Sequence, residues 1–428
     1  MNAYQGNAIF DAINMNHTGT WIISLLCFLC VIIRPFKINE AIWACIGAMM
    51  LLVLGFISLN ESVSAINKGV DVYLFLTGMM LLAETAREER LFDWFAANAA
   101  KFAKGSSSKL FVLIYLVAIL TTAFLSNDAT AVVLTPAVAT AAKSAKIKKP
   151  LPFLLICAFV ANAASFLLPI SNPANLIIYQ NQLPSLLQWM PLYLLPSIVS
   201  ITVTYFALRF TQRKYLSQPL EKEVSVTPLT KGGFTSLVGI ISTGIVLLTC
   251  SAYKIQLGLP TAITGIITSS IVLVIVKKKP GKILRGVSWQ ILFLVAGLFV
   301  IVEAIDKTGL VAILTNTLVH YVQDFPNLTA LSAGLAAAFG GNLINNLPAG
   351  LIAGSVLQAS HLPELLHRAV LIGIDLGPNL SVPGSLATIL WIAVLRREGI
   401  SISGWQFLKL GSFIMITAII LTLVSLWI

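Results

Sequence analysis

The chain has 428 residues, of which 57% are hydrophobic and 11% charged, and its formal net charge is +11. Soluble domains carry about 25% charged residues, so this composition excludes an ordinary soluble globular protein. Apolar runs of membrane-spanning length recur from Trp21 to Ile428, and they predict one all-α integral membrane domain. The first 20 residues contain no Lys or Arg, so we expect a retained first span and no cleaved signal peptide.

Most of the apolar segments have the length of a complete membrane span. They cover residues of about 19–34, 40–58, 71–86, 188–210, 235–252, 259–276, 288–305 and 406–427. Two other segments, 110–142 and 327–359, are interrupted at Ser126-Asn127-Asp128 and at Asn345-Asn346. An α-helix rises about 1.5 Å per residue, so arms such as 110–126 and 131–142 fall short of the hydrocarbon core of about 30 Å. We therefore expect two re-entrant hairpins.

Two further segments, 151–180 and 364–397, are long for one straight span and carry Pro, Gly and Asn in their middle. They are expected to unwind at Pro169–Asn175 and at Gly377–Ser385. Non-helical backbone at membrane depth survives only where it is buried in protein or lines a cavity. The sequence thus predicts about ten transmembrane helices plus two re-entrant hairpins.

The positions of the basic residues predict the orientation of these spans. With the N-terminus outside, the cytoplasmic loops hold 24 of the 28 Lys and Arg residues, as the positive-inside rule requires. Both termini then lie on the outer side of a bacterial cell inner membrane. This distribution also accounts for the net charge without a nucleic-acid partner. It does not distinguish a hairpin from two complete spans, because both give the same sidedness.

The two halves of the chain resemble each other. Matching residues 219 positions apart are Gly78 with Gly297, Glu84 with Glu303 and Leu91 with Leu310. We interpret residues 1–210 as repeat one, 211–234 as a cytoplasmic linker and 235–428 as repeat two. Five spans in each half invert the second copy, which is the architecture of secondary transporters. The chain contains no GxxxxGK[ST] motif, so energy is expected from an ion gradient or a separate subunit.

Asp128 and Asp375 are predicted to lie near the middle of the membrane. An ionised Asp there costs about 2.5–3.5 kcal/mol on insertion scales, so such a residue is rarely incidental. Burial disfavours the charged form of a carboxyl, and both residues are therefore candidates for proton coupling in an antiporter. The alternative is that they only cap the helices that follow them, and the two roles are compatible.

Amide and hydroxyl side chains gather at the same helix breaks. The candidate substrate-binding residues are Asn127, Asn162, Ser171, Asn172, Asn175, Asn345, Asn346, Asn379 and Ser385. They suit a small neutral polyhydroxyl solute or a partly dehydrated cation, although single asparagines could merely satisfy freed backbone groups. No nucleophile–base set or metal-ligand motif lies in the predicted core, so we expect no catalytic residue, metal or cofactor.

Several of these motifs resemble the arsenite/antimonite efflux permeases of the ion transporter superfamily. The matching stretches are Trp289-Gln290-Ile291, Asn345-Asn346-Leu347-Pro348, Asp375-Leu376-Gly377-Pro378 and Gly384-Ser385-Leu386-Ala387-Thr388, with Asn127-Asp128-Ala129 in the first half. The resemblance covers nearly the whole chain. It implies proton-coupled export of arsenite, and of antimonite, and adds Thr388 to the substrate-binding candidates.

The resemblance also leaves questions open. Some members work with a cytosolic arsenical-pump ATPase subunit, which is therefore a candidate partner. Relatives often carry Asp where this chain has Asn162, which removes one candidate proton carrier. The Asn-rich hairpin tips are shared with sodium/proton antiporters and silicate exporters, so either activity on the same fold is the alternative prediction.

Overall fold

The computed structural model describes residues 15–218, 220–221, 226–360 and 362–428, and every regular element in these ranges is a helix. Six of the described helices are long and apolar enough to cross a membrane, or seven if the bent pair α4–α5 forms one span. This confirms the all-α integral membrane class. The expected number of ten spans stays a prediction, since residues 17–33 of α2, and α3 and α10, are shorter apolar helices than a complete span needs.

The described part of the first half holds sixteen elements, from α2 to η5. In order they are α2 (Met15–Ile33), η1 (Pro35–Lys37), α3 (Glu40–Val53), α4 (Leu59–Lys68), α5 (Val70–Glu88), α6 (Leu91–Ala103), α7 (Ser107–Phe124), α8 (Asn127–Ala129), η2 (Thr130–Leu134), α9 (Thr135–Ser144), α10 (Leu151–Ala163), η3 (Pro169–Ser171), α11 (Pro173–Tyr179), η4 (Gln180–Gln182), α12 (Leu186–Gln212) and η5 (Arg213–Tyr215).

The second half follows a similar order. It holds α13 (Lys231–Ala252), α14 (Gly258–Val276), α15 (Gly281–Gly286), α16 (Gln290–Asp306), α17 (Leu310–Asp324), α18 (Pro326–Ile344), α19 (Asn346–Gln358), α20 (Glu364–Leu376), η6 (Gly377–Asn379), η7 (Val382–Gly384), α21 (Leu386–Arg397), α22 (Gly404–Val424) and η8 (Ser425–Trp427). Both halves thus run through long helices, a surface helix, a hairpin, a broken helix and a last long helix.

Two helix crossings link the halves at glycines that the sequence pairs. Helix α5 packs on α14, and α16 packs on α3. A side chain at Gly78 would overlap the carbonyl oxygen of Thr261, and a Cβ at Gly297 would lie 2.8 Å from the carbonyl carbon of Ala44. Both crossings therefore require a residue without a Cβ. The repeat boundaries themselves remain a prediction.

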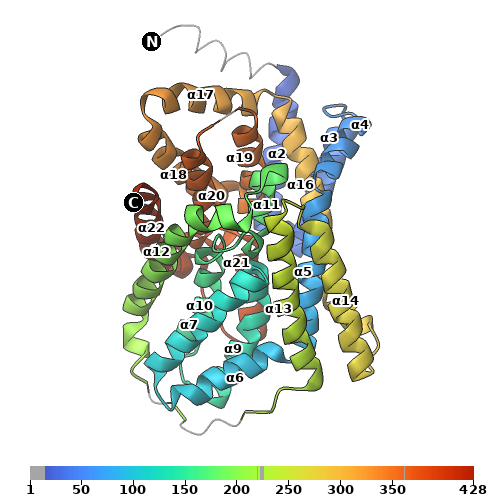
Figure 1. Cartoon of the computed structure of the whole chain (residues 1–428). Helices are drawn as coiled ribbons and strands as arrows, with labels where there is room; N and C mark the ends of the chain where they lie inside the picture. Colours follow the sequence, from blue (N-terminus) through green and yellow to red (C-terminus); the bar gives the residue numbers. More distant parts are fainter. Residues whose placement is uncertain (1–14, 219, 222–225, 361) are drawn as a thin grey trace.

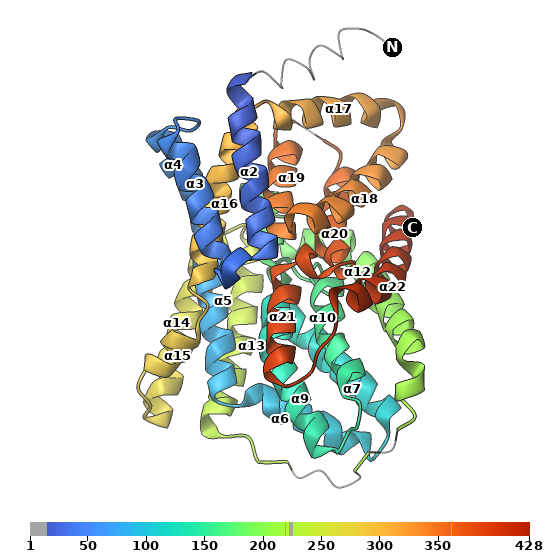
Figure 2. The ribbon, with the colours of Figure 1, turned by 180° about the vertical axis from the view of Figure 1, so that it is seen from behind.

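The two hairpins enter from opposite ends of the molecule. The surface helices α6 and α17 lie at these ends, which we call the α6 side and the α17 side (Figure 1). The α7–α9 hairpin reaches inward from the α6 side and the α18–α19 hairpin from the α17 side, as the reverse view shows (Figure 2). The first arms α7 and α18 have 18 and 19 residues and pass as candidate spans by length and composition, although at 1.5 Å per residue they rise only about 27 and 28 Å. The second arms are shorter, with 10 residues in α9 and 13 in α19, and the re-entrant interpretation stays a prediction.

The second broken helix unwinds where the sequence predicts, and the first one unwinds earlier. The second break occupies residues 377–385, between the end of α20 and the start of α21, as expected. The first break starts earlier than expected, because α10 ends at Ala163, and it finishes before Asn175, which lies inside α11. Asn172 caps α11 and Pro173 occupies its first position, where a proline costs no hydrogen bond.

Candidate functional site

The starts of four described helices meet around a small cavity in the middle of the molecule. Helices α8 and α19 bring the two hairpin tips, and α11 and α21 bring the second pieces of the two broken helices. The cavity is lined by Leu76, Asn127, Asp128, Asn172, Pro173, Ile291, Val295, Asn346, Leu347, Ser385 and Leu386. Its volume is about 10 Å³, which is room for one water molecule.

Each of these helix starts carries a side-chain cap. The Ser126 hydroxyl accepts from the Ala129 N–H at 3.2 Å, and the Asn345 amide oxygen accepts from the Leu347 N–H at 3.3 Å. The Asn172 amide oxygen accepts from the Ala174 N–H at 3.0 Å. Ser385 caps α21 in the same way, through the Ala387 N–H at 3.2 Å. The caps fix the entry angles of the four helices, so the polar lining of the cavity depends on these hydrogen bonds.

Asp375 lies directly behind this cavity in the last turn of α20. Its side chain is fully buried, and its two carboxylate oxygens accept hydrogen bonds from Asn172 Nδ2 at 2.7 Å and Ser165 Oγ at 2.8 Å. None of the ion pairs among the described residues involves Asp375. Asp375 does not line the cavity itself and touches it through Asn172. A carboxyl held only by neutral donors is suited to bind and release a proton.

Asp128 occupies a different position from Asp375. It is half-buried at the tip of the first hairpin and lines the central cavity together with a second cavity of about 70 Å³. Glu84 near the end of α5 and Ser288 also line this second cavity, and α5 ends towards the α6 side (Figure 1). The Asp128 carboxylate has no hydrogen-bond partner among the described residues, and Asp128 lines both cavities.

Three of the other predicted residues hold the first break together. Asn162 donates to the Asn379 amide oxygen at 3.0 Å, and Asn379 donates to the Phe159 carbonyl at 3.0 Å. Asn175 donates to the Ser165 carbonyl at 3.0 Å. Asn175 thus satisfies backbone carbonyls of the broken segment, the structural role that the sequence left open, whereas the Asn162–Asn379 pair joins the two broken helices. The side-chain oxygens of Asn162 and Asn175 are buried without a partner among the described residues.

The remaining predicted residues, Ser171, Asn345 and Thr388, do not line the cavity but are close in sequence to residues that do. Ser171 Oγ donates to the Ala123 carbonyl at 3.2 Å and so joins the first break to the hairpin arm α7. Asn345 has a φ of 77° and donates to the Pro383 carbonyl at 3.1 Å, which joins the second hairpin to the second break. The Thr388 hydroxyl is buried in α21 and has no partner among the described residues.

Two residues of this network were missed by the sequence reasoning. Ser165 is the second donor to Asp375, and its single hydroxyl hydrogen is shared with the Asn162 carbonyl, which lies 2.7 Å from Oγ. Asn342 in α18 donates to the Gly377 carbonyl at 2.9 Å and accepts from the Ser381 hydroxyl at 2.6 Å. Asn342 is a polar residue in an apolar run, a signal that was available, whereas a single Ser in such a run is unremarkable.

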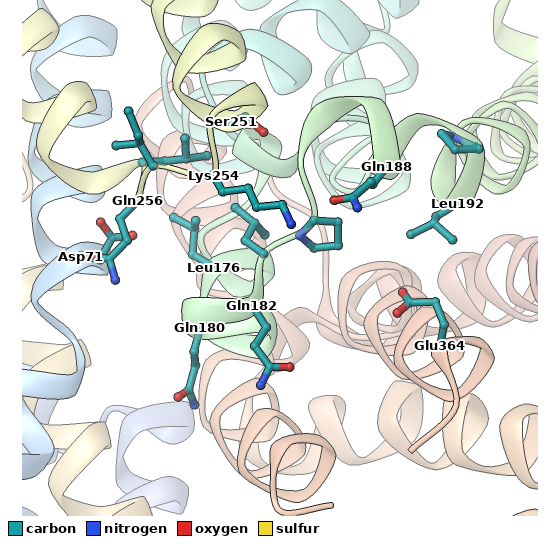
Figure 3. Close-up of a pocket in the computed structure, with 15 residues that line it drawn as sticks. Asp71, Leu176, Gln180, Gln182, Gln188, Leu192, Ser251, Lys254, Gln256 and Glu364 are labelled. Carbon is teal, nitrogen blue, oxygen red and sulfur yellow. The ribbon is translucent and has the colours of Figure 1, made fainter. Parts of the chain in front are cut away.

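A larger cavity of about 640 Å³ opens towards the α17 side, at the ends of helices α5, α11, α12, α13, α14 and α20. Gln180, Gln182 and Gln188 line it, and the Lys254 side chain extends into it (Figure 3). Leu176 of α11 also lines it, only three residues after Pro173 of the central cavity. One helical turn of α11 therefore separates the cavity on the α17 side from the centre of the site. Open space lies on both sides of the centre.

Apolar helices, two hairpins and two broken helices around a central polar cavity define a membrane transporter. The chain matches the family described as citrate transporter (CitMHS) over residues 28–373 and belongs to this family.

The chain is also similar to several curated proteins over nearly its whole length. It is 25% identical to the arsenical pump membrane protein of Escherichia coli (strain K12), over 94% of this chain and 97% of that protein. It is 26% identical to the putative arsenical pump membrane protein of Bacillus subtilis (strain 168), over 92% of this chain and 95% of that protein. These similarities confirm the resemblance to arsenical permeases that the motifs indicated.

Two solved structures share the fold. The Alcanivorax borkumensis YdaH transporter gives a TM-score of 0.56 at 13% identity, covering 85% of this chain and 86% of that one. Neisseria gonorrhoeae MtrF gives a TM-score of 0.54 at 14% identity, covering 96% of this chain and 95% of that one. At these identities the likeness concerns the fold alone, and it agrees with the predicted class of all-helical membrane transporter.

Proposed function

We propose that this chain is a secondary transporter that exports trivalent arsenic, as arsenite and also antimonite, in exchange for protons. The membrane is a bacterial inner membrane with both termini outside, so that the α6 side faces the cytoplasm. The observation that carries the proposal is Asp375, a fully buried carboxyl held by Asn172 and Ser165 and by no cation among the described ion pairs. Relatives named arsenical pump membrane proteins, similar along nearly the whole chain, support the substrate.

The chemistry of the central cavity favours arsenous acid over citrate. Arsenous acid is uncharged near neutral pH and resembles a small triol. Amide and hydroxyl groups such as those of Asn127, Asn172, Asn346 and Ser385 can both donate and accept hydrogen bonds to it. Citrate carries several negative charges and would need cations, and no Lys or Arg is among the described residues that line this cavity. We therefore assign substrate binding to this lining, with Asn162, Ser171, Asn175, Asn345, Asn379 and Thr388 as its support.

The two carboxyls have separate roles in the proposed exchange. Asp128 lies between the central cavity and the one on the α6 side, where it meets substrate and protons from the cytoplasm. Asp375 accepts hydrogen bonds from Asn172 and Ser165, which flank the first break, so its protonation changes contacts between the two broken helices. Protonation of Asp375 weakens the hydrogen bond that it accepts from Asn172. Because Asn172 caps α11, and Leu176 of α11 lines the cavity on the α17 side, proton binding then affects the wall of that cavity.

Transport by everted membrane vesicles tests this function. With an imposed proton gradient and no ATP, we expect saturable arsenite uptake that is indifferent to sodium. Asp375→Asn should abolish this uptake while the protein remains in the membrane, and the control Asp324→Asn, an exposed residue at the end of α17, should transport normally. Normal transport by Asp375→Asn would show that Asp375 has only a structural role.

The same vesicles distinguish the alternatives. Sodium-driven proton movement without arsenite uptake would instead indicate a sodium/proton antiporter, and gradient-driven uptake of silicic acid without arsenite uptake would indicate a silicate exporter. Uptake that appears only after adding ATP and a cytosolic arsenical-pump ATPase subunit would show that the separate subunit, and not the proton gradient, supplies the energy.

A further inference from the structure

A third cavity, unrelated to the polar centre, lies between α6, α7 and α13. Its volume is about 370 Å³, and its walls include Phe92 and Phe95 of α6, Leu120 of α7, and Ile241 and Ile245 of α13. Thr121 is the one polar residue among the described walls, and its hydroxyl already donates to the Val117 carbonyl at 2.8 Å. The cavity therefore offers no hydrogen bond to a polar solute and suits hydrocarbon.

The open side of this cavity faces the lipid bilayer. Both α7 and α13 have the length and composition of membrane spans. Three of the wall residues, Leu120, Ile241 and Ile245, have exposed fractions of 58%, 52% and 59%. In a membrane these surfaces contact acyl chains, so a groove that opens between them is filled from the bilayer.

Positive charge gathers where the cavity meets the α6 side. The cavity begins at Leu91, the first residue of α6, and the preceding Arg90 has a side chain that is 71% exposed. Lys231 is the exposed first residue of α13 and takes part in no ion pair among the described residues. Glu89 lies against Gly232 and Gly233, which brings the starts of α6 and α13 together.

The acidic groups at this place are already paired. Lys278 Nζ lies 2.7 Å from the Glu89 carboxylate, and Arg90 Nε lies 3.4 Å from the Asp93 carboxylate. Arg87 in turn pairs with Glu84 and Glu88, so Lys231 is the cation at this place without an ion pair among the described residues. Together with the exposed Arg90 it attracts an anionic headgroup, as basic surfaces bind anionic lipids.

We propose that this cavity is a binding site for one anionic phospholipid. One acyl chain occupies the apolar groove between α6, α7 and α13, and the headgroup phosphate lies between Arg90 and Lys231. The site joins the first hairpin arm to a helix of the other half of the chain, so the bound lipid bridges two parts of the transporter that have few direct contacts there.

Native mass spectrometry of the purified full-length protein with added phosphatidylglycerol tests the site. Gly244 lines the groove, and a Cβ there would lie 3.4 Å from the Phe124 ring, an ordinary contact. Gly244→Phe therefore fills the groove, whereas Val246→Phe adds the same ring at a lipid-facing position of α13 outside it. We expect one tightly retained phosphatidylglycerol on the wild type and on Val246→Phe, and at least tenfold weaker retention on Gly244→Phe.

The headgroup is tested independently of the groove. The double variant Arg90→Gln with Lys231→Gln changes only exposed side chains, so it should fold, and it should lose the preference for phosphatidylglycerol over phosphatidylcholine by about tenfold. Equal retention of lipid by Gly244→Phe and Val246→Phe would refute the placement of the acyl chain in the groove. Equal binding of both lipids by the wild type would overturn the anionic headgroup, and with it the proposal.

Discussion

Asn172 makes two different contacts that substitution can separate. Its oxygen caps α11 through the Ala174 N–H, and its nitrogen donates to Asp375 at 2.7 Å. Asn172→Ala removes both contacts. Asn172→Ser should keep the cap and lose only the contact to Asp375, because Ser385 caps the corresponding helix α21 with backbone angles of −139° and 142°, close to the −148° and 132° of Asn172.

The two losses have different sizes. Removing an N-cap costs about 1 kcal/mol, and losing a hydrogen bond to a charged group costs about 1.5–3 kcal/mol. We therefore expect Asn172→Ala to lower the free energy of unfolding by roughly 2.5–4 kcal/mol and Asn172→Ser by roughly 1.5–3 kcal/mol. Both variants leave an oxygen of the fully buried Asp375 without its donor, which is why the second contact dominates.

Unfolding of the purified protein by sodium dodecyl sulfate in mixed micelles measures these differences. Asn67→Ala, at an exposed position of α4, is the control and should change the free energy of unfolding by less than about 0.5 kcal/mol. A cost below about 0.5 kcal/mol for Asn172→Ala would refute the reasoning, because it would mean that neither contact is formed in the folded protein. If Asn172→Ala and Asn172→Ser lowered the free energy of unfolding equally, the predicted contribution of the cap would be refuted, while that of the bond to Asp375 would stand.

Two further predictions use the same protein. Ser165→Ala removes the other donor to Asp375 and should cost about 1.5–3 kcal/mol in the same titration; an unchanged free energy of unfolding would contradict the bond. Gly78→Ala forces α5 away from the backbone of α14 at Thr261 and should cost about 1–3 kcal/mol, seen as a lower melting temperature. Gly281→Ala, which meets no atom within 4 Å, is its control, and equal melting temperatures would argue against the close crossing.

Much of the fold follows from the lengths of the apolar segments and from the polar residues that interrupt them, and a sequence shows both directly. The hairpin tips at Asn127 and Asn345 and the second break after Asp375 were predictable because polar or Gly-Pro residues interrupt apolar runs there. The start of the first break was not predictable, since Ala163 and Ala164 carry no signal that ends a helix.

The candidate site was predictable as a set of residues but not as a network. The sequence places Asn172 and Asp375 at breaks of different halves, and only the fold shows that they bond to each other. Asn175 was expected in an unwound segment, yet it lies inside α11 and binds backbone carbonyls. Partner choice depends on distances between distant segments, which no local pattern encodes.

The single turn of α11 between Pro173 and Leu176 also determines where the membrane voltage acts. This turn rises only about 4.5 Å, and the cavities beyond it open towards opposite ends of the molecule. Water in such cavities conducts the potential inward, so the voltage drops across the thin barrier instead of across the whole bilayer. A charge that passes this turn then experiences most of the potential, worth about 2.3 kcal/mol per 100 mV. The electrical work of a transport cycle is thereby concentrated on one short helix.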